Sequence, residues 1–244
     1  METSTDRVLG NRLQLMQPRD GYRAAIDPVL LAAAVPAKSG ERVLDLGCGV
    51  GTAALCLAGR VAGVAVHGID LQPALVALAV RNAAANGLAD RASFESGDLL
   101  GFKDRAFDHV LANPPYLARA TASISPNPIK AMANVEGDAK LTDWVACAIA
   151  AAKDGGSVTF IHRADRAPEL RACMMLGLGS LHLLPLLPRA DAAAKRILLQ
   201  GIKGAPAGFQ ECAPWPLHEA DGTFTAATQA ILRDAAALPL RAPA

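Results

Sequence analysis

The sequence has few aromatic residues and no excess of charge of either sign. Aromatic side chains make up 4% of the 244 residues, and 24 lysines and arginines nearly balance 23 aspartates and glutamates. A protein that coats nucleic acid nonspecifically needs an overall basic field, so that class is excluded. Any nucleic-acid partner would have to bind a local patch.

Patterns for metal binding, disulfides and membrane insertion are also missing. The five cysteines form no Cys-x-x-Cys pair and no cysteine–histidine cluster with the spacing of zinc ligands. The first residues lack the apolar region of a signal peptide, and charges or prolines interrupt every longer apolar run. We therefore expect reduced cysteines, no metal, no membrane contact and a cytoplasmic location.

Hydrophobic residues, at 52%, are ample for a sizeable core. From Glu41 onward, short apolar runs alternate with longer alanine-rich runs, which is typical of βαβ units around a parallel sheet. Two later runs joined by a polar loop, 181–186 and 196–202, predict a closing antiparallel hairpin. The other predicted strands are 42–46, 65–70, 92–95, 107–112 and 156–161, and the predicted helices are 52–60, 73–86, 140–152 and 165–176.

Shorter segments flank this α/β unit. Residues 1–40 contain an extended or hairpin-like stretch and then Asp27-Pro28, which suits a helix N-cap followed by proline at the first helical position. Residues 204–216 are rich in proline, glycine and alanine and predict a surface strap, followed by a helix near 225–237. We therefore divide the chain into a lead-in at 1–40 that covers a cleft, an α/β domain at 41–203, and a strap and helix at 204–244 packed on that domain.

A glycine-rich loop follows the first strand of the α/β domain. Asp45 lies at the strand end, and Gly47, Gly49 and Gly51 have the spacing G-x-G-x-G ahead of a helix. Glycines let the backbone approach a ligand closely, and a helix N-terminus presents free N–H groups to a carboxylate. Asp45 can accept from an ammonium group, whereas the pyrophosphate of a dinucleotide would gain nothing from a carboxylate. The loop therefore favours a cofactor with a methionine moiety, S-adenosylmethionine.

Two further acids fit the rest of that cofactor. Asp70 ends the second strand, where it can accept from both ribose hydroxyls, and Asp98 follows the third strand, where it can accept from the adenine amino group. The predicted cofactor site also includes Cys48, Leu71 and Asn113. Structural alternatives stay open, namely glycines that only make a tight turn, a solvated acid at Asp70, and ordinary Gly-Asp turn chemistry at Asp98.

The fourth strand runs directly into Asn113-Pro114-Pro115-Tyr116. Ligands of an open parallel sheet bind beyond the carboxyl ends of its strands, so this tetrapeptide should face the glycine loop. The lone pair of an amide or aromatic amine is delocalised, and it attacks a methyl sulfonium only when the nitrogen is drawn toward tetrahedral geometry. The Asn113 side-chain oxygen and the Pro114 carbonyl can each accept an amine hydrogen bond that strengthens as positive charge develops.

The rest of the tetrapeptide suits the same chemistry. The prolines have a fixed φ and no N–H, so they hold the carbonyl in place without adding competing donors. Tyr116 can offer a flat surface for a base or an amide plane, worth about 1–3 kcal/mol for a base. We predict that Asn113, Pro114, Pro115 and Tyr116 are catalytic and that Tyr116 contacts the substrate. The alternative is a structural Pro-Pro turn with Tyr116 in the core.

Residues 41–116 resemble class I S-adenosylmethionine-dependent methyltransferases that act on amino groups, namely N6 of adenine, N2 of guanine, or the glutamine amide of release factors. The resemblance implies a Rossmann-like, seven-stranded, mostly parallel sheet with helices on both faces. Residues 15–32 are similar to the Q-x-x-x-G-Y-R-x-x-x-D-x-x-L-L-A lead-in of the bacterial tRNA1(Val) adenine-N6 methyltransferase family, and the likeness continues to His218–Gly222. It implies methylation of N6 of an adenosine in tRNA.

The same resemblance implies that Gln17, Tyr22, Arg23 and Asp27 line or cover the cleft. Arg23 could pair with an RNA phosphate or with the methionine carboxylate, and Tyr22 could stack on a base, so both are predicted to bind substrate. The alternative is that Tyr22 only packs and that Asp27 is only an N-cap. Ala24 departs from the family, which commonly has an aromatic residue there.

Other substrates and roles were weighed against tRNA. An amino group of rRNA fits the tetrapeptide equally well. Glutamine-directed enzymes have a sizeable helical domain before the cofactor loop, where this chain has about forty residues, and the intact acids and tetrapeptide argue against a non-catalytic cofactor-binding module. The loop 117–138 is a candidate lid that would order the substrate, and a passive connection is the open alternative. Some of the scattered basic residues could form a phosphate-binding rim: Arg119, Lys130, Arg163, Arg166, Arg171, Arg189, Lys195, Arg196 and Lys203.

Overall fold

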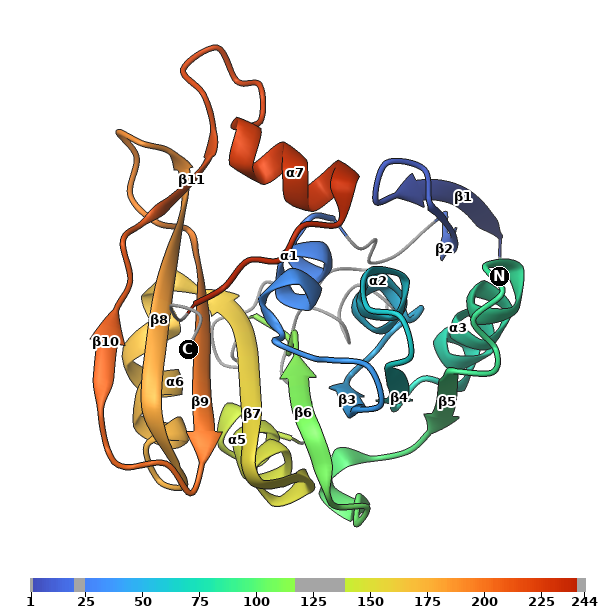
Figure 1. The fold of residues 1–244 in the computed structure, drawn as a ribbon. Helices are drawn as coiled ribbons and strands as arrows, with labels where there is room; N and C mark the ends of the chain where they lie inside the picture. Colours follow the sequence, from blue (N-terminus) through green and yellow to red (C-terminus); the bar gives the residue numbers. More distant parts are fainter. Residues whose placement is uncertain (1, 20–24, 117–138, 241–244) are drawn as a thin grey trace.

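A computed structural model describes residues 2–19, 25–116 and 139–240, and within these ranges nine strands form one mixed sheet (Figure 1). The strands are β3 (Arg42–Leu46), β4 (Ala65–Asp70), β5 (Ala92–Ser96), β6 (Phe107–Ala112), β7 (Ala152–Arg163), β8 (Leu178–Arg189), β9 (Arg196–Lys203), β10 (Phe209–Glu211) and β11 (Trp215–His218). Their order is β10-β8-β9-β7-β6-β3-β4-β5, with β11 also paired to β8.

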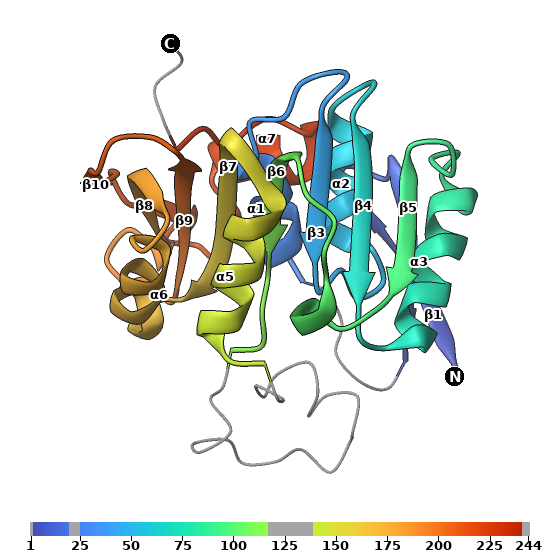
Figure 2. The same cartoon turned by 90° about the horizontal axis from the view of Figure 1, so that it is seen from below.

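The pairing of the central strands confirms the predicted Rossmann-like sheet. β3 is parallel to β4 and β6, β4 is parallel to β5, and β6 is parallel to β7. β9 is antiparallel to both β7 and β8, which is the predicted closing hairpin. These seven strands form the sheet that the resemblance implied, and Figure 2 shows the arrowheads of β3, β4 and β5 at one edge.

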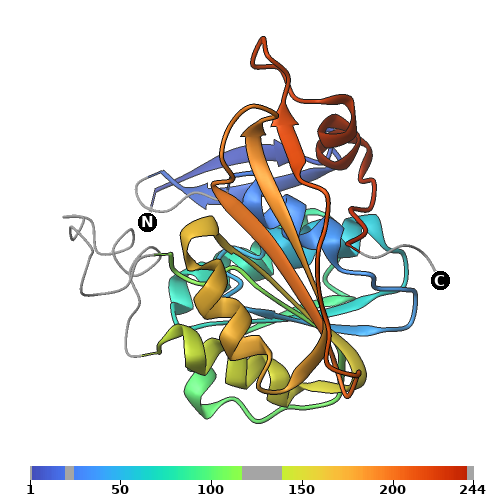
Figure 3. The ribbon, with the colours of Figure 1, turned by 90° about the vertical axis from the view of Figure 1, so that its left-hand side faces the viewer.

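Helices cover both faces of the sheet (Figure 3). One apolar cluster includes Leu30, Leu55 and Ile161, and the other includes Phe160 and Leu170. The neighbours Phe160 and Ile161 enter opposite clusters because successive side chains of a strand alternate between faces. The helices are α1 (Asp27–Ala34), α2 (Thr52–Arg60), α3 (Pro73–Ala85), α5 (Leu141–Ala151), α6 (Ala167–Met174) and α7 (Ala226–Asp234), with short turns η1 (Leu99–Gly101) and η2 (Ala164–Arg166).

The prediction of a plain surface strap at 204–216 was incomplete. β10 and β11 pair in parallel with β8 and widen the seven-stranded sheet. Neither short strand shows a periodic apolar pattern, and Pro216 lies inside β11, which is tolerated at an edge. The strap is tied to α7 by Trp215, whose Nε1 donates to Thr228 Oγ1 at 3.0 Å.

An N-terminal hairpin, β1 (Thr3–Val8) and β2 (Leu13–Pro18), packs beside α2 and α3 (Figure 1). Two asparagines, Asn82 within α3 and Asn86 at its C-cap, hydrogen-bond the backbone of β2 as a neighbouring strand would. Asn82 Oδ1 accepts from the Met16 amide at 2.7 Å, and its Nδ2 donates to the carbonyls of Met16 and Val50 at 3.1 and 3.0 Å. Asn86 makes the equivalent pair with Gln14 at 2.8 and 2.7 Å. Asn82 therefore joins the hairpin to the glycine-rich loop.

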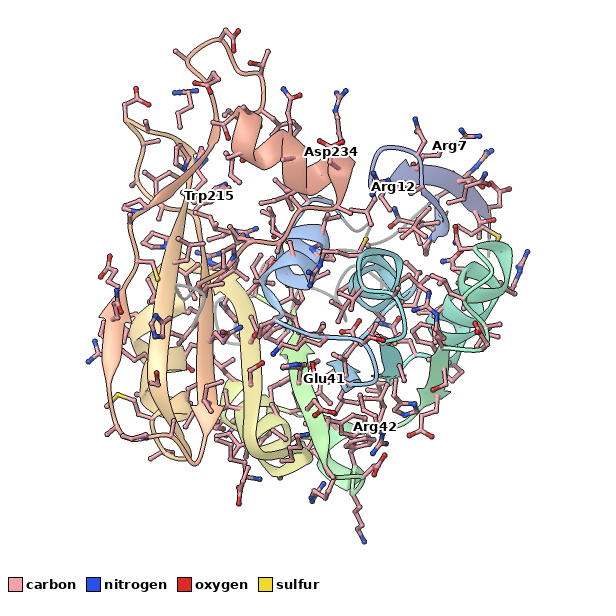
Figure 4. All side chains as sticks on the ribbon, viewed as in Figure 1. Arg7, Arg12, Glu41, Arg42, Trp215 and Asp234 are labelled. Carbon is pink, nitrogen blue, oxygen red and sulfur yellow. The ribbon has the colours of Figure 1, made fainter. Side chains whose placement is uncertain are left out.

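The hairpin also contacts the C-terminal helix. Arg12, in the turn between β1 and β2, donates from Nη1 to the carbonyl of Asp234 at the end of α7 at 3.1 Å (Figure 4). Leu13 and Leu15 of β2 belong to the same apolar cluster as α1 and α2. Residues from both flanks of the α/β unit thus pack on one face of its sheet. No helix in the described ranges is long and apolar enough to cross a membrane.

We predict that Asn82→Ala lowers the free energy of unfolding by roughly 2–3 kcal/mol. The substitution removes three hydrogen bonds of a fully buried side chain and leaves backbone groups without partners. Urea unfolding followed by circular dichroism measures the change. Asn86→Ala is the matched control, since water can replace its bonds at a half-buried position. Equal losses for the two variants would contradict the anchoring role of Asn82.

Candidate active site

A cleft of about 220 Å³ lies at the carboxyl ends of β3, β4 and β6. It brings together the glycine-rich loop, the strand-end acids and the tetrapeptide that the sequence singled out. Gly51 is the exception, since it is the N-cap of α2 and does not line the cleft. From the predicted cofactor residues the lining includes Asp45, Gly47, Cys48, Gly49, Asp70 and Leu71.

The glycine-rich loop is fixed to the end of β4. The amides of Gly47 and Cys48 donate to the Ile69 carbonyl at 2.8 and 3.0 Å. Gly47 has a φ of +70°, which disfavours residues with a Cβ, and a Cβ there would collide with the indole ring of Trp144. Glycine is therefore required at 47 by both the backbone angle and the ring beside it.

Asp45 is buried beneath the loop. Its Oδ2 accepts from the Ala54 amide at 3.1 Å, in the first turn of α2. Burial raises the pKa of Asp45 to about 8, the nearby charge of Asp70 adds to the rise, and the Ala54 hydrogen bond opposes it. The carboxyl of the free protein is therefore mostly protonated at neutral pH, and a cation beside it would favour the ionised form.

Asp70 ties the loop to the start of α3. Its Oδ2 accepts from the Gly49 amide at 2.9 Å and its Oδ1 from the Gln72 amide at 2.8 Å. Burial raises the pKa of Asp70, and the two amide hydrogen bonds oppose that rise. A carboxylate oxygen can accept more than one hydrogen bond, so the side chain keeps capacity for ligand hydroxyls.

Asp98 has a local structural role and also reaches the cleft. Its Oδ1 accepts from the Leu100 amide at 2.9 Å and caps η1, which is the turn chemistry that the sequence left open. The same residue lines the cleft together with Leu71, whose side chain is 59% exposed. Capping uses one carboxylate oxygen, so it does not exclude contact with a ligand.

All four residues of the tetrapeptide line the cleft directly after β6. Pro114 is buried, whereas Asn113, Pro115 and Tyr116 are half-buried. The Tyr116 hydroxyl lies 2.7 Å from Asn113 Oδ1 and 2.7 Å from Asp27 Oδ2. The tyrosine therefore touches the lead-in as well as the asparagine.

The expectation that Asp27 caps a helix was wrong. The N-cap of α1 is Ile26, and Asp27 is the first helical residue. Its carboxylate instead accepts from Arg196 Nε at 2.9 Å and contacts the Tyr116 hydroxyl. A carboxylate in the first turn of a helix is also favoured by the helix dipole. Two interactions outside the helix thus determine where this side chain points.

Arg196 and His162 complete the surroundings of Tyr116. The Arg196 guanidinium carbon lies 4.4 Å from the centre of the tyrosine ring and covers that face of the ring. The His162 ring contacts the tyrosine edge-on at 5.5 Å between centres. Burial, with a smaller effect from the charge of Arg166, lowers the pKa of His162 to about 4. His162 is therefore neutral at physiological pH.

Four of the basic residues considered for RNA contact have acidic partners. Arg196 pairs with Asp27, and the other pairs are Arg163–Asp165, Arg166–Glu169 and Arg189–Asp191. Most of their charge is thus balanced within the protein. Tyr22, Arg23, Arg119, Lys130 and the candidate lid at 117–138 lie outside the described residues.

Several lining residues were not predicted from their chemistry. Thr52 follows the glycine loop, and its buried Oγ1 has no hydrogen-bond partner among the residues that the structure describes. Its place at the start of a helix after the glycines was an available signal. Trp144 carried no signal, because its position opposite Gly47 depends on the tertiary fold. Gln17, implied only by resemblance, is buried and lines the cleft from β2.

Among residues 2–19, 25–116 and 139–240, no group of three or more histidine, cysteine, aspartate or glutamate side chains is placed to hold a metal ion.

Comparison with known proteins agrees with this arrangement. Residues 25–137 match the family described as the methyltransferase small domain. The chain is 27% identical over 196 residues to the tRNA1(Val) (adenine(37)-N6)-methyltransferase of Actinobacillus succinogenes, covering 79% of this chain and 81% of the relative. The crystal structure of a predicted O-methyltransferase from Agrobacterium tumefaciens superposes with a TM-score of 0.73 at 25% identity, covering 87% and 98% of the two chains. The chain is an S-adenosylmethionine-dependent methyltransferase.

The fold of this methyltransferase is shared with enzymes of different substrates. A geranyl diphosphate C-methyltransferase from Streptomyces coelicolor, solved with S-adenosyl-L-homocysteine, geranyl diphosphate and Mg²⁺, superposes with a TM-score of 0.55 at 13% identity. That match covers 72% of this chain and 78% of the other. The acceptor of the methyl group therefore has to be argued from the site and not from the fold.

We predict that cofactor binding to this methyltransferase releases a proton from Asp45. The free carboxyl is protonated below about pH 8, whereas an ammonium partner favours the carboxylate, so affinity should rise with pH between 6 and 8. The slope should approach about tenfold per pH unit for one proton. Isothermal titration calorimetry in buffers of different ionisation enthalpy counts the protons. Asp45→Asn should remove this release, and an unchanged proton count in that variant would disprove the assignment.

Proposed function

We propose that this methyltransferase transfers a methyl group from S-adenosylmethionine to the exocyclic N6 amine of an adenosine in tRNA. The observation that carries the proposal is the shared cleft, in which the glycine loop with its acids faces the Asn-Pro-Pro-Tyr tetrapeptide. The acceptor is supported by the lead-in and by the relative in Actinobacillus succinogenes, which is named for adenine N6 in tRNA1(Val).

The cofactor fits the polar groups of the cleft. Asp45 would accept from its ammonium group, while Thr52 Oγ1 and the amides that begin α2 would donate to its carboxylate. Asp70 would accept from the ribose hydroxyls and Asp98 from the adenine amino group. The Thr52 hydroxyl, buried in a cleft wall and without a partner in the described part of the chain, supports a polar ligand at this position. When bound, the cofactor supplies an electrophilic methyl group.

The tetrapeptide would prepare the target amine. Asn113 Oδ1 and the Pro114 carbonyl would accept its two hydrogens, which draws the nitrogen toward tetrahedral geometry and frees its lone pair. The base would stack on the face of Tyr116 that Arg196 leaves open. No general base is required if the proton leaves after methyl transfer. Tyr22 and Arg23 remain part of the proposed substrate site by resemblance.

The proposed organisation places catalysis in residues 41–203. The lead-in at 1–40 would supply Gln17 and Asp27 to the cleft, and residues 204–244 would pack on the same domain. Within the basic rim, Arg163, Arg166 and Arg189 each pair with an acidic residue, which reduces what these three would add to phosphate attraction. Recognition of tRNA would also use the shape of its anticodon loop and an unstacked base.

The acceptor can be identified directly. The protein is incubated with labelled S-adenosylmethionine and total RNA from a strain that lacks its gene, and the modified nucleoside is identified after digestion. N6-methyladenosine confined to the tRNA fraction is the expected result. Label confined to rRNA or to protein would overturn the proposed substrate.

We predict that Asn113→Ala lowers the rate of methyl transfer by about 10²–10³-fold, the usual cost of removing one group that stabilises developing charge. Cofactor affinity, measured by calorimetry, should change less than about threefold, since the backbone of the loop is untouched. Asn86→Ala, at the C-terminal end of α3 and outside the residues that line the cleft, is the matched asparagine control. Near-normal turnover by Asn113→Ala would rule out the proposed role of its amide.

A further inference from the structure

Three exposed arginines gather where the N-terminal hairpin meets the C-terminal helix. Arg7 lies on β1, Arg12 in the turn between β1 and β2, and Arg233 in the last turn of α7. Arg12 Nη1 donates to the carbonyl of Asp234 at 3.1 Å, so the hairpin turn contacts the end of α7 (Figure 4). We call Arg7, Arg12 and Arg233 the hairpin patch.

The positive charge of the hairpin patch is only partly balanced. In the described part of the chain, no acidic side chain forms an ion pair with any of its three guanidinium groups. Asp234 adds a negative charge beside three positive ones, and Asp6 faces the other side of the hairpin, where it accepts from Gln17 Nε2 at 2.7 Å. Three arginines of the basic rim, in contrast, each pair with an acidic residue. The hairpin patch is therefore a net positive surface.

The turn that carries Arg12 is packed firmly against α7. Leu9, Gly10 and Asn11 have φ angles of +49°, +62° and +69°, a region that leucine rarely adopts. Leu9 is nevertheless buried in the core cluster that includes α1 and α2, and a Cβ on Gly10 would collide with the carbonyl of Arg233. Burial and close contact thus hold the turn in this unusual conformation, so the patch is presented on a fixed surface.

The same hairpin reaches the cleft. Gln17 of β2 lines the cleft, and Arg7 lies opposite Gln14, three residues further along that strand. This separation is about 10 Å along the hairpin, at about 3.3 Å per residue. Phosphates of one strand of a nucleic acid helix are spaced by about 3.4 Å along its axis, so the patch is about three nucleotides from the cleft. Asn82 fixes this distance because it bonds both to β2 and to the glycine-rich loop.

We infer that the hairpin patch binds the phosphate backbone of the RNA whose base enters the cleft. The inference rests on the proposed function, since it takes RNA as the methyl acceptor. Guanidinium groups suit phosphate because their donors form a rigid fork that matches its oxygens. Arg12 uses one of its five N–H donors for the Asp234 carbonyl, which orients the group and leaves other donors for a phosphate. Such contacts position the RNA without reading its sequence.

The salt dependence of RNA binding tests the hairpin patch. The triple variant Arg7→Gln, Arg12→Gln, Arg233→Gln is titrated with fluorescently labelled total tRNA between about 50 and 200 mM NaCl. Each phosphate contact adds about 0.7–0.9 to the slope of log affinity against log salt concentration, so losing three should flatten the slope by about 2–3. Affinity at about 0.1 M salt should fall at least tenfold.

The matched control removes the same charge from the opposite edge of the sheet. Lys38, Lys103 and Arg105 are exposed and precede β3 or β6, at the edge away from the cleft. Changing all three to glutamine should alter the slope by less than about 1 and the affinity by less than about threefold. Equal effects of the two triple variants would overturn the inference, since tRNA would then respond only to the total charge of the protein.

Methylation kinetics separate RNA binding from catalysis. The patch variant should raise KM for tRNA at least about tenfold and keep kcat and cofactor affinity within about twofold, because none of its three arginines lines the cleft. A lower kcat with an unchanged KM would contradict the inference. The double variant Arg7→Gln, Arg233→Gln spares the contact of Arg12 with α7 and should still flatten the salt slope by about 1–2. Thermal unfolding confirms that each variant folds.

The inference and the proposed function fail by different results. N6-methyladenosine in tRNA, together with an unchanged salt slope in the folded double variant, would overturn the inference and leave the proposed function standing. Label that enters protein and not RNA would refute the proposed function, and the inference with it.

Discussion

The cleft depends on the contact between the glycine-rich loop and the end of β4. One carbonyl, that of Ile69, receives the amides of Gly47 and Cys48, and the carboxylate of Asp70 receives the amide of Gly49. These bonds turn the chain back at the sheet edge, and α2 begins directly after the loop at Thr52, which lines the cleft. Asp45 is buried by the same turn, so its raised pKa is a consequence of how the loop is held.

The sequence was most informative where structure depends on neighbouring residues. Strands such as Arg42–Leu46 and Phe107–Ala112 have the predicted bounds because runs buried on both faces are mostly apolar. The glycine-rich loop and its place at the sheet edge could be predicted because its glycines, Asp45 and Asp70 lie within one βαβ unit. The edge strands β10 and β11 could not, since three or four residues interrupted by proline carry no periodicity. The roles of individual site residues stay predictions.

Contacts between side chains far apart in the sequence could not be predicted. Asp27 and Tyr116 were singled out separately, and nothing in either motif indicated that their side chains meet 89 positions apart. Arg196 was grouped with scattered surface arginines, although it pairs with Asp27 and covers the tyrosine ring. The role of Asn82 could not be predicted either, because nothing in an alanine-rich helix indicates that one of its asparagines hydrogen-bonds the backbone of a strand. Such pairings depend on the packing of elements and not on local pattern.

The contact between Trp144 and Gly47 restricts which residues either position can accept. The indole ring occupies the space in which a side chain at 47 would begin, and the loop backbone at 47 has a left-handed angle. A smaller residue at 144 would open the space without changing that angle, so it would leave a hole in the cleft wall and still not permit substitution at 47. A substitution at either position is therefore unfavourable. The absence of a side chain at Gly47 lets Trp144 of α5 pack directly against the glycine-rich loop.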